Sequence, residues 1–75
     1  ESPLVLVNVI APIILRLLEQ GLADLVMTGG LMILSGILEE QEAEIIQKIN
    51  LRGFLVKERQ IVDDWVALVA KKETA

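Results

Sequence analysis

The chain has 75 residues, 53% of them hydrophobic, with no Cys, no His and a formal net charge of −4. A chain of this length forms at most one domain, and without Cys or His it excludes disulfides, thiolate nucleophiles, most zinc sites and a serine–histidine catalytic pair. The seven basic residues are scattered rather than gathered on one face, so no direct nucleic-acid partner is expected.

The chain begins with Glu-Ser-Pro, without an initiator Met or a signal-peptide pattern, so we interpret it as a cytoplasmic piece of something longer. Its longest apolar run, residues 4–15, is interrupted by Asn8 and Pro12 and is shorter than the ~20 residues that a membrane helix needs. We therefore expect no membrane partner. Residues 4–7 predict a buried strand that ends at Asn8, because Pro3 is acceptable at the first position of a strand.

An amphipathic helix is predicted after a short turn at residues 9–11. Pro12 falls in its first turn, where a missing N–H is tolerated. Gly21 weakens the helix, and Gly29 and Gly30 are expected to end it in the left-handed conformation. The apolar residues that recur at intervals of three and four are Ile13, Ile14, Leu17, Leu18, Leu22, Leu25 and Val26.

Residues 31–38, Leu-Met-Ile-Leu-Ser-Gly-Ile-Leu, lie between a glycine turn at residues 28–30 and an acidic run at residues 39–44. A short, almost wholly apolar run of this kind is typical of a strand buried on both faces. Such a strand needs cover above and below. A 75-residue chain with two helices does not readily supply both.

A second helix is predicted from the acidic run to Gly53. Its acidic residues lie near the positive amino end of the helix, and Lys48 and Arg52 lie near the negative carboxyl end. Gly53 follows the last turn as a helix-ending glycine. The apolar face of this helix is formed by Ala43, Ile45, Ile46 and Ile49.

Two strands complete the chain. Residues 54–61 mix apolar and charged side chains, which is typical of a protected edge strand. Residues 65–70 are apolar at every position, so we predict an interior strand, joined to the edge strand by a turn at Asp63 and Asp64. The polar tail, residues 71–75, is expected to be frayed.

The order strand, helix, strand, helix, strand, strand predicts an α/β fold with two parallel strands and a terminal antiparallel hairpin. Because parallel crossovers are almost always right-handed, both helices lie on one face. With the charged strand outside, the spatial order is first, second, fourth, third. The other face is then bare, and residues 4–7 become an unprotected apolar edge. We therefore expect more protein on that side, either a missing amino-terminal half or a second copy of the chain.

Five short segments carry a resemblance to a known family. They are Asn8-Val9-Ile10-Ala11, Gly29-Gly30, Leu34-Ser35-Gly36-Ile37-Leu38-Glu39-Glu40-Gln41, Gly53-Phe54 and Trp65-Val66-Ala67-Leu68. Together with the predicted topology, they resemble the carboxyl-terminal half of the Rossmann-like sheet of class I S-adenosylmethionine-dependent methyltransferases. The resemblance is closest to the bacterial enzymes that methylate large-subunit ribosomal protein eleven. It spans nearly the whole chain, so residues 1–75 are interpreted as a single incomplete catalytic domain.

The resemblance implies methylation of lysine side chains and an amino-terminal amine of a ribosomal protein, with S-adenosylmethionine as the donor. It implies that Asn8 is catalytic, and that Asn8 and Val9 form the cofactor-binding part of this segment. This position agrees with the rule that ligands of open α/β sheets lie outside the carboxyl ends of the strands. The family's glycine-rich cofactor loop, its ribose-binding acid and its substrate-recognition domain have no counterpart here. We therefore expect the isolated chain to be inactive and not to bind S-adenosylmethionine measurably.

Simpler interpretations stand beside these. Asn8 could be a helix cap or a turn residue. Ser35 and Gly36 are interpreted as a structural turn, because no base is available to activate the hydroxyl. The acidic residues 39–44 are interpreted as a solvated first turn rather than a cation site, so no metal ligand is predicted. Trp65 is interpreted as a core residue rather than a stacking platform.

The leading hypothesis is a fragment of a protein methyltransferase that is catalytic only when it is joined to its missing half. The alternative is a non-enzymatic α/β interaction module that self-associates through the exposed edge at residues 4–7 and the bare sheet face. A third possibility is a remnant left by proteolysis of the intact enzyme. Upstream coding sequence separates the first two, since a strand followed by a glycine-rich loop supports the enzyme.

Overall fold

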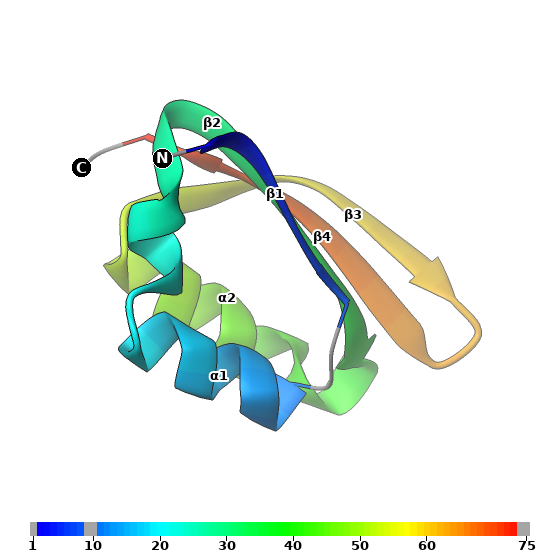
Figure 1. The fold of residues 1–75 in the computed structure, drawn as a ribbon. Coiled ribbons are helices and arrows are strands. Elements are labelled where there is room, and N and C mark those ends of the chain that lie inside the picture. Colours follow the sequence, from blue (N-terminus) through cyan, green and yellow to red (C-terminus); the bar gives the residue numbers. More distant parts are fainter. Residues whose placement is uncertain (1, 9–10, 74–75) are drawn as a thin grey trace.

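The computed structural model describes residues 2–8 and 11–73, which form one four-stranded sheet covered by helices (Figure 1). Its elements are β1 (Ser2–Asn8), α1 (Ala11–Glu19), the 3-10 helix η1 (Leu22–Leu25), β2 (Val26–Leu38), the 3-10 helix η2 (Glu39–Gln41), α2 (Glu42–Leu51), β3 (Phe54–Val62) and β4 (Trp65–Lys72). The strands lie in the order β1-β2-β4-β3. This is the spatial order predicted from the sequence.

The pairing of the strands also matches the prediction. β1 runs parallel to β2, with Leu4 opposite Leu31 and Asn8 opposite Ser35. β4 lies between β2 and β3 and is antiparallel to both. β3, which carries most of the charged side chains of the sheet, is an edge strand. Asp63 adopts a positive φ of 56° in the turn between β3 and β4, as expected for a hairpin at this place.

The two α-helices pack side by side on the same face of the sheet, as predicted (Figure 1). The core lies between these helices and the strand side chains that point toward them. It consists of Val7, Ile14, Leu18, Leu22, Ala23, Val26, Met32, Leu34, Ile37, Ile45, Ile49, Phe54, Val66, Leu68 and Ala70. Among the described residues, no helix is long and apolar enough to cross a membrane.

The opposite face of the sheet, which we call the open face, carries apolar side chains that no helix or strand of residues 2–8 and 11–73 covers. Alternation along β2 buries Met32 and Leu34 completely but leaves Leu31 36% exposed, so this strand is buried on its helix side alone. The prediction of burial on both faces is therefore met on one face only. The large exposed apolar residues of the open face are Leu4, Leu6, Leu31, Leu55, Val62 and Trp65.

The first helix is shorter than the sequence predicted. It ends at Glu19 because Gly21 adopts a left-handed φ of 101° and stops the helical path. η1 follows, and β2 already begins at Val26. Gly29 and Gly30 therefore lie inside a strand and do not end a helix, which corrects that prediction. The apolar residues Leu22, Leu25 and Val26 continue the helical spacing across this break, so periodicity alone could not locate it.

Two expectations for the last strand were also wrong. Trp65 is 47% exposed, because strand alternation places it on the open face, where it pairs with Leu38 and Val62. Lys72 belongs to β4 instead of a frayed tail and is 5% exposed. Its Nζ donates hydrogen bonds to the carbonyl oxygens of Ala23 and Val26, at 2.8 and 2.9 Å.

An ion pair joins the second helix to the edge strand. Nη2 of Arg59 on β3 donates to Oε1 of Glu42 on α2 at 2.6 Å, and Nε of Arg59 donates to Oε2 of the same carboxylate. The hydrogen bond to Glu42 raises the pKa of Arg59. This bidentate contact holds the start of α2 against the sheet.

Candidate functional site

The carboxyl ends of the two parallel strands bring Asn8 and Ser35 together at one end of the sheet. Asn8 is the last residue of β1, and its partner in the β1–β2 register is Ser35. Both side chains lie on the open face, since the neighbouring register positions Val7 and Leu34 point into the core. Ligands of open α/β sheets bind outside this end of the strands, so this pair marks the candidate site.

The two side chains are in direct contact. The Ser35 hydroxyl lies 3.0 Å from Asn8 Oδ1 and donates a hydrogen bond to it. The carbonyl oxygen of Val7 is a more distant second acceptor, at 3.4 Å. Asn8 is exposed and Ser35 is half-buried, so the carboxamide faces the solvent while the hydroxyl is partly enclosed by the sheet.

The pairing of β2 with β4 is irregular at Ser35 and Gly36. The β2–β4 register shifts between Leu34 and Ile37, and Gly36 has a left-handed φ of 82°. Irregularities of this kind re-aim side chains and are frequent beside active sites. Ser35 was interpreted from the sequence as a turn residue; the structure places it inside the strand, within this irregularity.

The predicted site residues are only partly described by the structure. Asn8 lies where the sequence placed it, at the carboxyl end of the first strand. Val9, the other predicted cofactor-binding residue, lies outside the described residues. Ser35 was not predicted as a site residue, because its contact with Asn8 depends on the register between two strands. The sequence did contain one signal for this contact. Asn8 and Ser35 are polar residues near the carboxyl ends of two consecutive strands that were predicted to be parallel.

An acidic hollow of about 410 Å³ opens at the same end of the sheet. It is lined by Leu38, Glu39, Glu40 and Asp64, where η2 meets the β3–β4 hairpin. The backbone N–H of Glu39 donates to the carbonyl oxygen of Asp64 at 3.3 Å, which ties the two segments together. Within residues 2–8 and 11–73, no three acidic side chains are grouped so that they could hold a metal ion.

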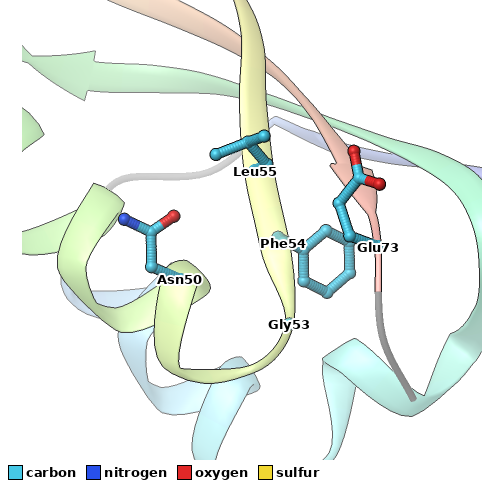
Figure 2. A pocket seen from close by; sticks show the side chains of 5 residues that line it. All are labelled: Asn50, Gly53, Phe54, Leu55 and Glu73. Atoms are coloured by element: carbon cyan, nitrogen blue, oxygen red, sulfur yellow. The ribbon is translucent and has the colours of Figure 1, made fainter.

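A second hollow, of about 360 Å³, lies at the opposite end of the sheet and does not belong to this site. Figure 2 shows Asn50 on α2 and Glu73 after β4 on either side of the start of β3, with Phe54 and Leu55 between them. The backbone N–H of Glu73 donates to the carbonyl oxygen of Gly53 at 2.8 Å. The hydrogen bond from Lys57 lowers the pKa of Glu73 below its ordinary value. These contacts support the fold.

Comparison with known proteins finds similar sequences over nearly the whole chain. The family model for ribosomal protein L11 methyltransferase matches residues 1–73. A ribosomal protein L11 methyltransferase from an Exiguobacterium species is 39% identical over 72 residues, which cover 96% of this chain and 23% of that protein. The corresponding Bacillus cytotoxicus protein is 40% identical over 73 residues, covering 95% of this chain and 23% of its own length. The chain therefore spans about a quarter of the relatives it matches.

Solved structures agree with the sequence comparison. The crystal structure of ribosomal protein L11 methylase from Lactobacillus delbrueckii subsp. bulgaricus superposes with a TM-score of 0.86 at 26% identity, covering 96% of this chain and 37% of that chain. A complex of M1.HpyAVI with SAM superposes with a TM-score of 0.72 at 20% identity, covering 93% of this chain and 44% of that one. At this lower identity the second likeness shows the fold alone.

Proposed function

Since the chain belongs to the ribosomal protein L11 methyltransferase family, we propose that it is the carboxyl-terminal part of a catalytic domain that methylates amines of a large-subunit ribosomal protein. Lysine side chains and an amino-terminal amine are the proposed acceptors. The observation that carries the proposal is the position of Asn8, exposed at the carboxyl end of β1. Because its substrate is a ribosomal protein, we expect the enzyme to act in the cytoplasm.

S-adenosylmethionine, when bound, supplies the methyl group on a sulfonium centre. The contribution of this chain is orientation, because an amine attacks only as a neutral base with its lone pair aimed at the carbon it will bond. Asn8 Oδ1 accepts an N–H of the amine and so turns the lone pair in the required direction. An amide is suited to this task, since it offers an acceptor without a charge that would favour the protonated amine.

The residues of the chain fit one side of a cofactor site. The exposed carboxamide of Asn8 can face both the amine and the donor, and we propose that the backbone at Val9 completes this side. The five glycines of the sequence form no Gly-x-Gly-x-x-Gly pattern. We therefore propose that the remaining cofactor contacts come from other parts of the enzyme, and that the isolated chain binds S-adenosylmethionine too weakly to measure.

The open face supports the proposal of a missing neighbour. Leu6 is 69% exposed and Trp65 47% exposed on a sheet face that the described part of the chain leaves uncovered, and a contiguous apolar surface usually marks an interaction site. We propose that an amino-terminal half of the enzyme covers this face and continues the sheet beyond β1. The same surface would allow the isolated chain to self-associate, which is the behaviour that the alternative interaction module requires.

A chimeric enzyme tests the proposed function. This chain replaces the matching segment of the Exiguobacterium relative, and transfer of labelled methyl groups from S-adenosylmethionine to the ribosomal protein is measured. We expect an active chimera, and we expect Asn8→Ala to lower kcat about 100-fold, which is typical for loss of an orienting contact. Asn50→Ala removes an exposed carboxamide from α2 and serves as the control. A chimera with the melting temperature of the relative but no methyl transfer would refute the proposal.

A further inference from the structure

The contact between Ser35 and Asn8 has a defined direction. A hydroxyl has one hydrogen to donate, and the nearer acceptor is Asn8 Oδ1, at 3.0 Å, compared with 3.4 Å to the carbonyl oxygen of Val7. In this arrangement the oxygen of the Asn8 carboxamide faces Ser35, and its NH₂ group points away from the hydroxyl. The hydrogen bond also restricts rotation of the amide group, which as an exposed terminal group would otherwise rotate broadly.

The hydrogen bond leaves a definite set of groups for a ligand. A carboxamide oxygen has two lone pairs, and Ser35 occupies one of them. The second lone pair remains available to an N–H donor that approaches from outside the strand end. A single remaining acceptor direction specifies the approach of an amine more narrowly than a freely rotating amide would.

The backbone holds Ser35 in the required place. Ser35 and Asn8 are register partners, so their Cα atoms are fixed by the β1–β2 pairing. Ser35 lies at the shift in β2–β4 pairing, between Leu34 and Ile37, and Gly36, at φ 82°, follows it directly, so the pairing with β1 is what holds Ser35 in place. The hydroxyl therefore comes from a strand position that is paired with β1, and precise orientation needs support of this kind.

We propose that Ser35 is a positioning residue, whose hydroxyl orients the Asn8 carboxamide toward the amine that is to be methylated. This inference rests on the proposed function of Asn8. Ser35 itself does not take part in the chemistry. It acts by limiting the carboxamide to one orientation, so its loss lowers the fraction of bound amine that is correctly aimed.

Nuclear magnetic resonance of the 75-residue chain carrying Leu6→Lys and Trp65→Lys, which remove the apolar contacts expected to cause association, tests the positioning step without any assay of activity. The heteronuclear NOE of the Asn8 side-chain Nδ2 reports its mobility, and Asn50, which is exposed on α2, supplies an internal reference. We expect Asn8 to be more ordered than Asn50. Ser35→Ala should lower the Asn8 value to that of Asn50, and Ser35→Thr, which keeps the hydroxyl, should restore it. An Asn8 value that is unchanged in Ser35→Ala would overturn the proposal.

Kinetics of the chimeric enzyme test the consequence. Ser35→Ala should lower kcat about tenfold and change the KM for S-adenosylmethionine less than twofold, while Ser35→Thr recovers most of the rate. In an Asn8→Ala background, Ser35→Ala should have no further effect, because there is no carboxamide left to orient. Thr28→Val, which removes a hydroxyl near the other end of β2, is the control. An equal loss in both backgrounds would show a merely structural role.

The two proposals fail in different ways. An Asn8→Ala enzyme with unchanged turnover would refute the catalytic role of Asn8, and positioning by Ser35 would fall with it. A slow Asn8→Ala enzyme together with a fully active Ser35→Ala enzyme would refute only the role of Ser35.

Discussion

The Nζ atom of Lys72 lies 2.9 Å from the carbonyl oxygen of Val26, and the same ammonium group donates to the carbonyl oxygen of Ala23 at 2.8 Å. Lys72 is only 5% exposed. The contact joins the end of the last strand to the segment where η1 passes into β2. The buried Lys72 at the end of β4 therefore stabilises the segment that connects α1 to β2.

We expect Lys72→Met to lower the free energy of unfolding by about 1–3 kcal/mol, because Met fills a similar volume but removes the buried ammonium group that donates to the carbonyl oxygens of Ala23 and Val26. Urea unfolding of the 75-residue chain measures the change. Lys48→Met, on the exposed side of α2, should change the stability by about 0.5 kcal/mol or less. Equal effects of the two substitutions would contradict the importance of the buried ammonium group.

Gly30→Ala should also destabilise the sheet. A Cβ atom at this position would lie 2.9 Å from the backbone oxygens of Met27 and Pro3, so the backbone itself would have to shift where β1 and β2 change register. We expect a loss of about 1–3 kcal/mol in unfolding experiments, which is typical of overpacking. Gly29→Asn is the matched control. Gly29 has a φ of +87° and open space around it, and Asn tolerates a left-handed backbone, so this variant should unfold with a smaller loss.

The strand order could be predicted from the sequence because it follows from side-chain patterns and one handedness rule. Charged side chains within residues 54–61 indicated an edge strand, and the apolar run at residues 65–70 indicated an interior strand. Right-handed crossovers then placed both helices on one face. Each inference used the kind of side chain at each position, and needed no atomic contact.

The end of the first helix could not be predicted in the same way. Leu22, Leu25 and Val26 continue the apolar spacing of α1, although the backbone leaves the helix at Gly21. The site was predicted in part for a similar reason. Asn8 is visible as the polar end of a strand, whereas its partner Ser35 depends on the register of β1 against β2, which a change of one residue would alter.

Acid should weaken the contact between Lys57 and Glu73. Lys57 Nζ lies 3.0 Å from Glu73 Oε1, and its hydrogen bond lowers the pKa of Glu73. The unfolded chain therefore binds a proton at Glu73 more readily than the folded chain does. The resulting stabilisation is fully present above the unfolded pKa, about 4.3, and is lost as the pH falls through the lower folded pKa.

Thermal melts of the wild type and of Lys57→Met between pH 7 and pH 3 measure this dependence. Without the ammonium group the folded pKa of Glu73 returns toward its ordinary value, so the variant should lose less stability on acidification than the wild type. Both side chains are largely exposed, so added salt should reduce the difference between the two proteins. Parallel pH profiles for wild type and variant would contradict the prediction.

The open face should make the isolated chain self-associate. Leu6 is 69% exposed on the edge strand β1, and Trp65 is 47% exposed on the same face. We expect sedimentation velocity to show dimers or larger species of the wild-type chain, and Leu6→Lys with Trp65→Lys to shift the population to monomer. Neither side chain lies in the core, so the double variant should remain folded.

Leu51→Lys provides the matched control for this experiment. Leu51 is 74% exposed, which exceeds the exposure of Leu6, but it lies at the end of α2 and not on the open face. If exposed leucines in general caused association, Leu51→Lys would reduce it as well. A wild-type chain that stays monomeric at high concentration would mean that an apolar sheet face of this size does not require cover, and the case for a missing half covering it would lose its physical basis.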